Sequence, residues 1–229
     1  MSIPVLILGE SGNGKTFSLR NFKPEEVSVI SIYKNRLWFD EKFPAFGMKC
    51  VKPPKTLAKD KQSFAQLHSA IYAWVEMAIR TAKTKVVVVD DSQFLMANEF
   101  TDRAMEKGYD KFTEIAVNFK HLIDFVNDLG DQDKIVYFLN HSEVVGEKCK
   151  IKTIGKMLDE KITVEGLFDI VLYCENYKFY TQANNMSTAK TPFGMFELEL
   201  DNDLKFVDSR IREFSGLAPL DGGDADAEA

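Results

Sequence analysis

The feature that most constrains this chain is a glycine-spaced segment that follows a short apolar run near the N-terminus. Residues 9–16 read Gly-Glu-Ser-Gly-Asn-Gly-Lys-Thr, which is the pattern G-x-x-x-x-G-K-[ST]. Residues 4–8 are all apolar, as in a parallel strand buried on both faces, and Phe17 and Leu19 begin a predicted helix. This order of strand, loop and helix favours a loop whose main-chain N–H groups surround a phosphate over a chance glycine-rich turn.

The residue types in this loop predict a nucleoside triphosphate together with Mg²⁺. Lys15 would reach the β- and γ-phosphate oxygens, and the Thr16 hydroxyl would bind the metal ion. A helix that begins near Lys15 would add the positive end of its dipole. The residues predicted to hold the nucleotide are Gly9, Glu10, Ser11, Gly12, Asn13, Gly14, Lys15, Thr16 and Phe17.

Length and charge set bounds on the rest of the molecule. With 229 residues and 45% hydrophobic content, the chain can bury one full core, so we predict one domain over residues 1–216. Residues 217–229 form an acidic tail, which we expect to be disordered and solubilising. In the alternative interpretation, the tail mimics DNA or docks on a partner. The tail supplies much of the net charge of −6, so a local basic groove on the body is not excluded.

Cysteine usage and hydropathy argue against several classes of protein. Cys50, Cys149 and Cys174 are odd in number and widely spaced, which disfavours a disulfide framework and a zinc site. His68 and His121 fall within helical patterns, where packing or surface roles are expected. No apolar run reaches membrane-spanning length and no basic flank precedes the first strand, so we expect neither a signal peptide nor a membrane anchor.

Alternating strand and helix patterns predict an α/β fold. Apolar runs indicate buried strands at residues 5–8, 27–32, 86–89, 135–139 and 170–174. Ser63 and Gln66 have the form of a capping box at the start of a helix. The apolar face of that helix is predicted to consist of Phe64, Leu67, Ile71, Trp74 and Ala78. A second helical pattern, over residues 112–129, ends at Gly130. Such alternation gives a parallel sheet that binds ligands at the carboxyl ends of its strands.

Two stretches depart from this alternation. Residues 33–62 lack periodicity and contain three prolines, which predicts a loop or a small hairpin insertion. Residues 168–200 contain closely spaced strand-like runs, with a turn at Asn184-Asn185 and a returning strand at residues 193–200. This β-rich end is similar to the antiparallel extension of RecA-like cores and unlike the helical lid of AAA+ motors. We therefore predict a RecA-like P-loop NTPase with a central, mostly parallel sheet, flanking helices and a C-terminal antiparallel β extension.

A second motif, which is acidic, follows the strand predicted at residues 86–89. The segment reads Val-Val-Val-Val-Asp-Asp, the Walker B pattern of an apolar strand that ends in a carboxylate. Asp90, at the strand tip, is predicted to hold Mg²⁺ through water, and Asp91 to orient or deprotonate the attacking water. The alternative is that the two acids end the strand and cap the next helix.

The general base usual in RecA-type enzymes, a glutamate at the end of a neighbouring strand, is missing from the pattern. The strand at residues 27–32 runs into Tyr33 and Lys34 without an acid. Glu10, inside the phosphate loop, and Glu76, in the helix before the Walker B strand, are poor substitutes. Hydrolysis is therefore expected to be slow or to use Asp91.

Polar residues also follow the strand predicted at residues 135–139. Asn140 and His141 stand where a γ-phosphate sensor is expected, and an Asn/Ser turn is the alternative. The next segment contains several lysines and glycines, which predicts a mobile polynucleotide-binding loop. Its lysines are Lys148, Lys150, Lys152, Lys156 and Lys161. Because acidic residues are interspersed, a solvated surface remains the alternative.

Four segments, in this order, resemble those of a known family. They are the phosphate loop, residues 88–95 (Val-Val-Asp-Asp-Ser-Gln-Phe-Leu), residues 151–159 (Ile-Lys-Thr-Ile-Gly-Lys-Met-Leu-Asp) and residues 188–196 (Thr-Ala-Lys-Thr-Pro-Phe-Gly-Met-Phe). The family is that of the phage AAA-domain ATP-binding proteins, which are RecA-like, core-only ATPases associated with phage recombination. Some of its members act as single-strand annealing proteins. The likeness runs from about residue 3 to residue 214, and residues 34–39 depart from it.

The resemblance implies ATP and Mg²⁺ as ligands, single-stranded DNA as the polymer and a single-strand-binding protein as a partner. It also implies a homo-oligomer, either a ring or a filament, in which a basic residue of the neighbouring subunit completes the site. Lys190 is the residue we predict for this role, and an exposed lysine beside a turn is the alternative. A phage-encoded protein of this kind would work in the cytoplasm of the host cell, without a membrane partner.

Three functions are compatible with these motifs. The first is an ATP-dependent recombination ATPase that binds or anneals single-stranded DNA, with Phe94 or Tyr109 stacking on bases. The second is a small-molecule or nucleotide kinase, against which the dispersed arginines argue. The third is a nucleotide-gated regulatory module with little turnover, for which the acidic tail would be the contact.

Overall fold

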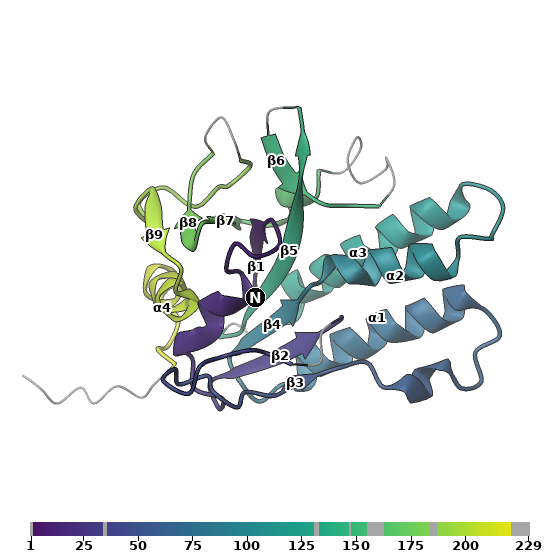
Figure 1. Ribbon diagram of the computed structural model, residues 1–229, viewed down its shortest axis with the longest axis horizontal. Helices are drawn as coiled ribbons and strands as arrows, with labels where there is room; N and C mark the ends of the chain where they lie inside the picture. Colours follow the sequence, from purple (N-terminus) through teal and green to yellow (C-terminus); the bar gives the residue numbers. More distant parts are fainter. Residues whose placement is uncertain are drawn as a thin grey trace, which may run out of the picture.

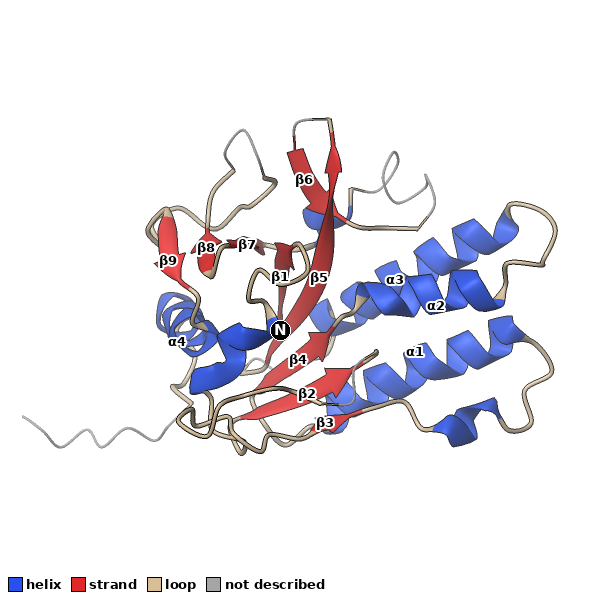
Figure 2. Cartoon of the chain, viewed as in Figure 1, coloured by secondary structure: helices blue, strands red, loops and turns tan. Residues whose placement is uncertain are grey.

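The chain folds as an α/β protein with a mostly parallel sheet between helices (Figures 1 and 2). The computed structural model describes residues 2–33, 36–130, 133–146, 148–154, 163–183 and 187–220. The strands are β1 (Ile3–Gly9), β2 (Val27–Ser31), β3 (Cys50–Val51), β4 (Val86–Asp90), β5 (Ile135–Val145), β6 (Lys148–Ile151), β7 (Ile170–Glu175), β8 (Lys178–Tyr180) and β9 (Glu199–Asp201). The helices are η1 (Thr16–Asn21), η2 (Lys55–Ala58), α1 (Phe64–Thr81), α2 (Gln93–Asp102), α3 (Asp110–Asn127), η4 (Val164–Leu167) and α4 (Leu204–Ser215).

The sheet has the strand order β3-β2-β4-β5-β1-β7-β8-β9. Its pairs are parallel from β3 to β7, and β8 and β9 extend it in antiparallel fashion. Strand β5 lies between β1 and β4, with Leu8 opposite Asn140 and Val89 opposite Phe138. The carboxyl ends of these three strands therefore meet at one edge, as the alternating pattern predicted.

The central strands are buried on both faces because both faces are covered by helices. On β1, Leu6 and Leu8 belong to the core cluster on the side of α1, α2 and α3. Val5 and Ile7 belong to the cluster that includes residues of η1 and α4. Figure 1 shows the same layers, with α1, α2 and α3 on one side of the sheet and α4 and η1 on the other. In the described part of the chain, no helix is both long and apolar enough to cross a membrane.

Helix α1 begins where the sequence predicted, but its buried face is different. The Ser63 hydroxyl accepts a hydrogen bond from the main-chain N–H of Gln66 at 3.2 Å, which confirms this half of the capping box. The fully buried residues are His68, Tyr72, Val75 and Ile79, one position beyond the predicted stripe, and Phe64 is 51% exposed. The imidazole of His68 binds the Asp102 carboxylate at 2.8 Å, so a polar residue occupies a core position. Hydrophobic periodicity alone does not predict this contact between His68 and Asp102.

One predicted β feature was wrong. Residues 193–198 are not a strand, because Pro192 and Gly194 (φ +80°) form a turn and only Glu199 and Leu200 of the predicted segment belong to β9. Of the two alternatives for residues 33–62, the loop agrees with the structure: the described part is mostly irregular, and its short strand β3 pairs parallel with β2. The turn expected at Asn184-Asn185 lies outside the described residues.

Helices α2 and α4 were missing from the sequence-based prediction. Helix α2 buries Gln93 and Glu99 beside Leu95 and Met96, so polar residues obscure its apolar face. Helix α4 has clear capping residues, since the Asp203 carboxylate accepts from two N–H groups of the first turn and Gly216 follows the last turn with φ +66°. The caps at positions 203 and 216 are the signal that would have identified it.

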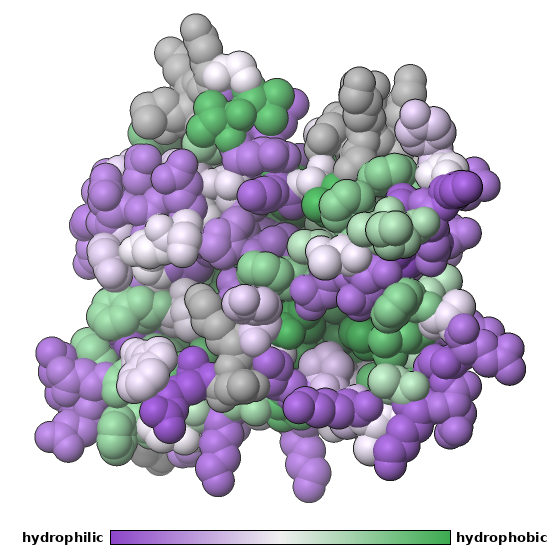
Figure 3. Space-filling model, turned by 45° about the vertical axis from the view of Figure 1, so that its right-hand side comes forward, coloured by the Kyte–Doolittle hydropathy of each residue, from purple (hydrophilic) through white to green (hydrophobic). Residues whose placement is uncertain are grey.

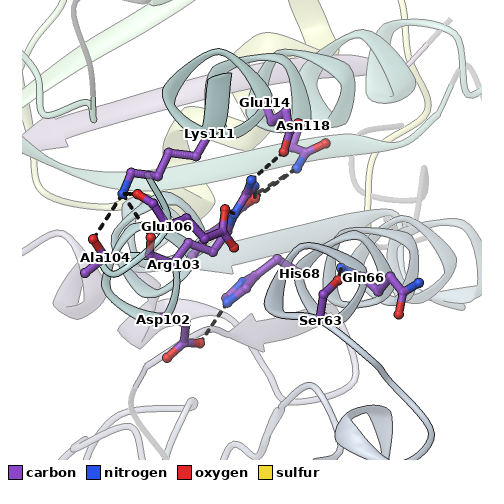
Figure 4. A network of polar contacts seen from close by, with 11 residues as sticks. Ser63, Gln66, His68, Asp102, Arg103, Ala104, Glu106, Lys111, Glu114 and Asn118 are labelled. Atoms are coloured by element: carbon purple, nitrogen blue, oxygen red, sulfur yellow. Dashed lines mark hydrogen bonds and ion pairs between the residues drawn. The ribbon is translucent and has the colours of Figure 1, made fainter. Parts of the chain in front are cut away.

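A buried ionic network holds α2 against α3. Arg103, directly after α2, binds Glu99 at 2.8 Å, Glu106 at 2.9 Å and Glu114 of α3 at 2.5 Å (Figure 4). The Lys111 ammonium, also shown in Figure 4, donates to the main-chain oxygens of residues 103, 104 and 106. The network therefore joins the C-terminal end of α2 to α3.

Candidate nucleotide-binding site

The loop between β1 and η1 bends through glycines with a left-handed backbone. Gly14 has φ +100°, and a β-carbon there would lie 2.7 Å from Cδ1 of Tyr177. A β-carbon on Gly9 would lie 2.3 Å from the main-chain oxygen of Cys174. Both positions therefore need glycine, since the β7–β8 hairpin packs directly on the loop.

Lys15 folds back across the loop. Its ammonium donates to the main-chain oxygens of Gly9 at 2.6 Å and Glu10 at 2.8 Å, and the residue is only 7% exposed. The charge is thus held at the carboxyl end of β1, inside the curve of the glycine-rich loop. This position is compatible with the predicted contact with β- and γ-phosphate oxygens, which stays a prediction.

Thr16 and Asp90 meet although 74 positions separate them. The Thr16 hydroxyl donates to Oδ1 of Asp90 at 3.1 Å, and Asp90 is 1% exposed at the end of β4. Hydroxyl and carboxylate oxygens are ligands that Mg²⁺ prefers, and this ion is commonly held by one or two protein groups with phosphate and water completing its shell. The pair therefore fits the predicted metal site.

Asp91 turns out of the strand toward His141. Its backbone has φ +57°, a left-handed conformation that Asp tolerates better than most residues, and it is 3% exposed. Its Oδ1 lies 3.3 Å from Nε2 of His141, whose main-chain N–H donates to the Gln93 side chain at 3.2 Å. The N-cap of α2 is Ser92, so neither acid occupies the capping position that the alternative interpretation gave them.

Asn140 lies in a strand, and the alternative of an Asn/Ser turn is wrong. Strand β5 continues to Val145, and its last residues pair with β6. The sequence did not reveal this extension, since a projecting two-stranded hairpin does not need apolar residues on both faces. The Asn140 side chain is fully buried, and its Oδ1 accepts from the Ser92 hydroxyl at 2.9 Å. Its Nδ2 has no hydrogen-bond partner within the described residues. A buried donor at the carboxyl edge of the sheet is compatible with the sensor that the sequence predicts.

Several of these groups line an open pocket of about 200 Å³. It is lined by Ser11, Gly12, Gly14, Lys15, Thr16, Phe17, Asp91, His141 and Tyr177. The fold thus brings most of the predicted loop residues together with Asp91 and His141, while Gly9, Glu10, Asn13, Asp90 and Asn140 are not among the lining residues. A larger hollow of about 760 Å³, between β9 and α4, contains none of the predicted site residues.

The helix expected after the loop is short and is not an α-helix. Residues Thr16–Asn21 form a single 3₁₀ segment, η1. Pro24 is consistent with the early end, because the residue before a proline disfavours helical backbone, and Phe22 is already extended (φ −73°, ψ 142°). The contribution that we expected from a helix dipole is correspondingly small, so main-chain N–H groups and Lys15 must supply most of the attraction for an anion.

Tyr177 is a site residue that sequence reasoning missed. It follows Asn176 in the turn between β7 and β8, where both residues have positive φ, and its ring lies edge-on to Phe17 with centroids 5.6 Å apart. The Arg20 guanidinium lies 4.7 Å from the centroid of the Phe17 ring. The Asn residue in a short connection between strands indicates the turn, but only the tertiary structure shows that the turn covers the phosphate loop.

The protonated thiol of Cys174 contacts the glycine-rich loop between β1 and η1. Its Sγ donates to the main-chain oxygen of Asn13 at 3.1 Å. Burial raises the pKa of Cys174 to about 12, although the nearby charge of Lys15 and a hydrogen bond from Asn202 act in the opposite direction. The thiol is therefore a hydrogen-bond donor and not a nucleophile at neutral pH. The three cysteines are free, as expected.

The predicted polynucleotide-binding lysines are only partly described. Lys148 and Lys150 belong to β6 and Lys152 directly follows it, so this portion is a β-hairpin and not the predicted loop. Lys156 and Lys161 lie outside the described residues. Lys190 pairs through its main chain with Val171 of β7 and does not line the pocket of its own chain, and its predicted action on a neighbouring subunit stays a prediction.

Comparison with protein-family models finds no match for this chain, and comparison with curated proteins finds none either.

Proposed function

We propose that this chain is an ATP-binding, Mg²⁺-dependent ATPase of the RecA-like type that binds single-stranded DNA as an oligomer in phage recombination or replication. The observation that carries the proposal is the meeting of the Thr16 hydroxyl and the Asp90 carboxylate at 3.1 Å beside the phosphate loop. Two motifs far apart in sequence thereby place two oxygen ligands suited to Mg²⁺ next to the buried Lys15. Strand β5 separates the two motif-bearing strands, an arrangement compatible with a RecA-like core.

In this proposal the chain's own residues bind the triphosphate and balance its charge. Main-chain N–H groups of the glycine-rich loop surround the phosphates, and the Lys15 ammonium neutralises charge on the β- and γ-phosphate oxygens. Mg²⁺, held by Thr16 and through water by Asp90, would neutralise further charge on the same oxygens. Phe17 and Tyr177 border the pocket with apolar ring surface.

Asp91 is the best-placed general base among the described residues. It lines the pocket, and the imidazole of His141 lies 3.3 Å from its carboxylate. Asp91 would accept the proton of a water that attacks the γ-phosphorus, while His141 fixes the orientation of the carboxylate. Glu76 lies on α1 and does not line the pocket, which agrees with its dismissal from the sequence.

His141 also links the nucleotide to the β5–β6 hairpin, which projects beyond the parallel strands in Figure 1. The residue belongs to β5 and shares a strand with the segment that pairs with the lysines of β6. Loss of the γ-phosphate next to His141 would therefore change the hairpin and its hold on a polymer.

Changing Asp90 or Asp91 to asparagine should affect the Mg²⁺ dependence of ATP turnover differently. Asp90→Asn should lower turnover by about a hundredfold and raise the Mg²⁺ concentration needed for half-maximal rate, because a metal-binding charge is lost. Asp91→Asn should lower the rate constant by a similar factor and leave the Mg²⁺ requirement and ATP affinity near their original values. Steady-state phosphate release over a range of Mg²⁺ concentrations distinguishes them. Identical Mg²⁺ profiles for both variants would contradict the assigned roles.

The proposed activity is tested by measuring ATP turnover with and without single-stranded DNA. We expect DNA to stimulate phosphate release and the stimulation to fall steeply as salt rises. The same assay with added nucleoside monophosphates detects the kinase alternative, which requires a phosphorylated product. Turnover that is indifferent to DNA at every salt concentration would refute the proposal.

A further inference from the structure

Another hollow, distinct from the one between β9 and α4, lies at the carboxyl end of β2. It measures about 510 Å³ and is bordered by the end of β2, the segment before η2, and helices α1 and α2. Its floor is apolar, with Ile32, Ile71 and Phe94 among the lining residues, and its charged rim consists of Lys52 and Lys55. No acidic residue is among the described residues that line it. Figure 3, which brings the side of α1–α3 forward, shows apolar side chains gathered in the middle of this face with hydrophilic ones around them.

An aromatic pair lies at the border of this hollow, formed by Phe94, which lines it, and the exposed Tyr33, which does not. The rings of Tyr33 and Phe94 are stacked, with centroids 4.3 Å apart and planes inclined by 13°. Tyr33 is 58% exposed, and the Lys52 ammonium donates to its main-chain oxygen at 2.7 Å. A flat aromatic surface beside lysines offers a stacking platform for an unpaired base and cations for the flanking phosphates.

Phe94 also separates this hollow from a smaller one that leads to the β5–β6 hairpin. The smaller hollow, of about 140 Å³, is lined by Phe94, His141 and Lys152 among others. The ring of His141 lies edge-on to that of Phe94, with centroids 6.3 Å apart. A path of lysines and aromatic rings thus runs from Lys55 past Phe94 to Lys152, and His141 lines both this path and the nucleotide pocket.

We propose that the Tyr33–Phe94 platform is a binding site for single-stranded nucleic acid, with Lys52, Lys55 and Lys152 on its phosphates. The inference rests on the proposed function and deepens it, because it says where the polymer lies and how it senses the nucleotide. Charge complementarity and ring stacking together select this occupant, since the bases of a duplex are paired and their faces are not accessible. Tyr109, the other aromatic residue considered from the sequence, is 84% exposed on the N-cap of α3, and its ring lies against Phe112 and not against the Tyr33–Phe94 pair.

The test is binding of a labelled oligodeoxythymidylate by fluorescence anisotropy, with a non-hydrolysable ATP analogue and over a range of salt concentrations. Phe94→Leu keeps an apolar side chain in place but removes the ring, and it should weaken binding about tenfold. Phe94→Trp should retain the affinity, and Tyr109→Leu is the matched control that should bind as the wild type does. Lys55→Ala should reduce the slope of log affinity against log salt by about 0.7, whereas Lys107→Ala, at an exposed lysine outside both hollows, should not.

The possible failures are distinguishable. If the wild type binds the oligonucleotide and Phe94→Leu binds it equally well, the platform is wrong while the proposed function stands. If Tyr109→Leu loses as much affinity as Phe94→Leu, the effect is not specific to the hollow and the assignment fails. If the wild type shows no salt-sensitive binding with the ATP analogue present, the proposed DNA-dependent function itself fails.

Discussion

Replacing Lys15 with alanine should reduce ATP turnover by about a hundredfold to a thousandfold, the loss expected when one donor to a developing anionic charge is removed. The structure gives the reason, since the ammonium is held at 2.6 Å from the Gly9 oxygen and 2.8 Å from the Glu10 oxygen at the base of the pocket. No other lysine or arginine is among the described residues that line this pocket. ATP affinity should also fall, by about tenfold or more, because the lysine meets the phosphates before the reaction as well as during it.

The matched control for this substitution is Lys23→Ala. It removes the same charge from an exposed lysine shortly after η1, so it preserves any effect of net charge on nucleotide binding. We expect its rate and affinity to equal those of the wild type. Phosphate release and nucleotide titration on the same samples separate the rate effect from the binding effect. Equal losses in the two variants would show that the effect is one of general charge and not of the loop.

Replacing Arg103 with alanine should lower the free energy of unfolding by about 3–5 kcal/mol, as expected when one partner of a buried ion pair is removed. Arg103 is 4% exposed and Glu99 is completely buried. Among the described residues, the substitution leaves this core carboxylate with the Asn118 amide, at 3.3 Å, as its remaining side-chain hydrogen-bond donor. Burial opposes the charge of Arg103, but hydrogen bonds to Glu114, Glu99 and Glu106 outweigh it and raise the pKa of Arg103. Because a domain is typically stable by only about 5–15 kcal/mol, the loss is large.

Urea unfolding measures the loss of unfolding free energy in Arg103→Ala. Two further variants show whether this loss comes from the unpaired charge. Arg210→Ala removes an exposed arginine from a surface pair with Glu213, and it should cost no more than about 1 kcal/mol. The double substitution Arg103→Met with Glu99→Leu removes both buried charges and should recover much of the stability lost in Arg103→Ala. If the double variant were less stable than Arg103→Ala, the penalty would come from packing and not from an orphaned carboxylate.

The parts of the fold that could be predicted are those in which burial dictates residue type. The apolar runs at β1 and β4 could be recognised because strands covered on both faces admit few polar residues. The approach of Thr16 to Asp90 also follows from the pattern, because parallel strands bring their carboxyl ends to one edge of the sheet. The sequence therefore predicts that the glycine-rich loop and Asp90 lie side by side, and the contact between Thr16 and Asp90 confirms this.

The remaining features depend on partners that are distant in sequence. His68 occupies a core position of α1 only because Asp102 binds it, and this displaces the buried face by one residue. The continuation of β5 through Asn140 and His141 depends on pairing with the end of β1, and its further extension to Val145 depends on pairing with β6. The contact of Tyr177 with the glycine-rich loop depends on how the β7–β8 hairpin packs. None of these contacts leaves a periodic signal in the sequence, since each is a polar or turn residue whose environment is created by another segment.

Titration of the wild-type protein with a fluorescent ATP analogue, in Mg²⁺ and again in excess EDTA, tests the central claim most directly. We predict saturable binding that weakens when Mg²⁺ is removed, and competition by ATP but not by adenosine, because the loop, Lys15 and the Thr16–Asp90 pair all act on the phosphates and their metal ion. Binding that is equally strong in EDTA and is displaced as well by adenosine as by ATP would contradict the account.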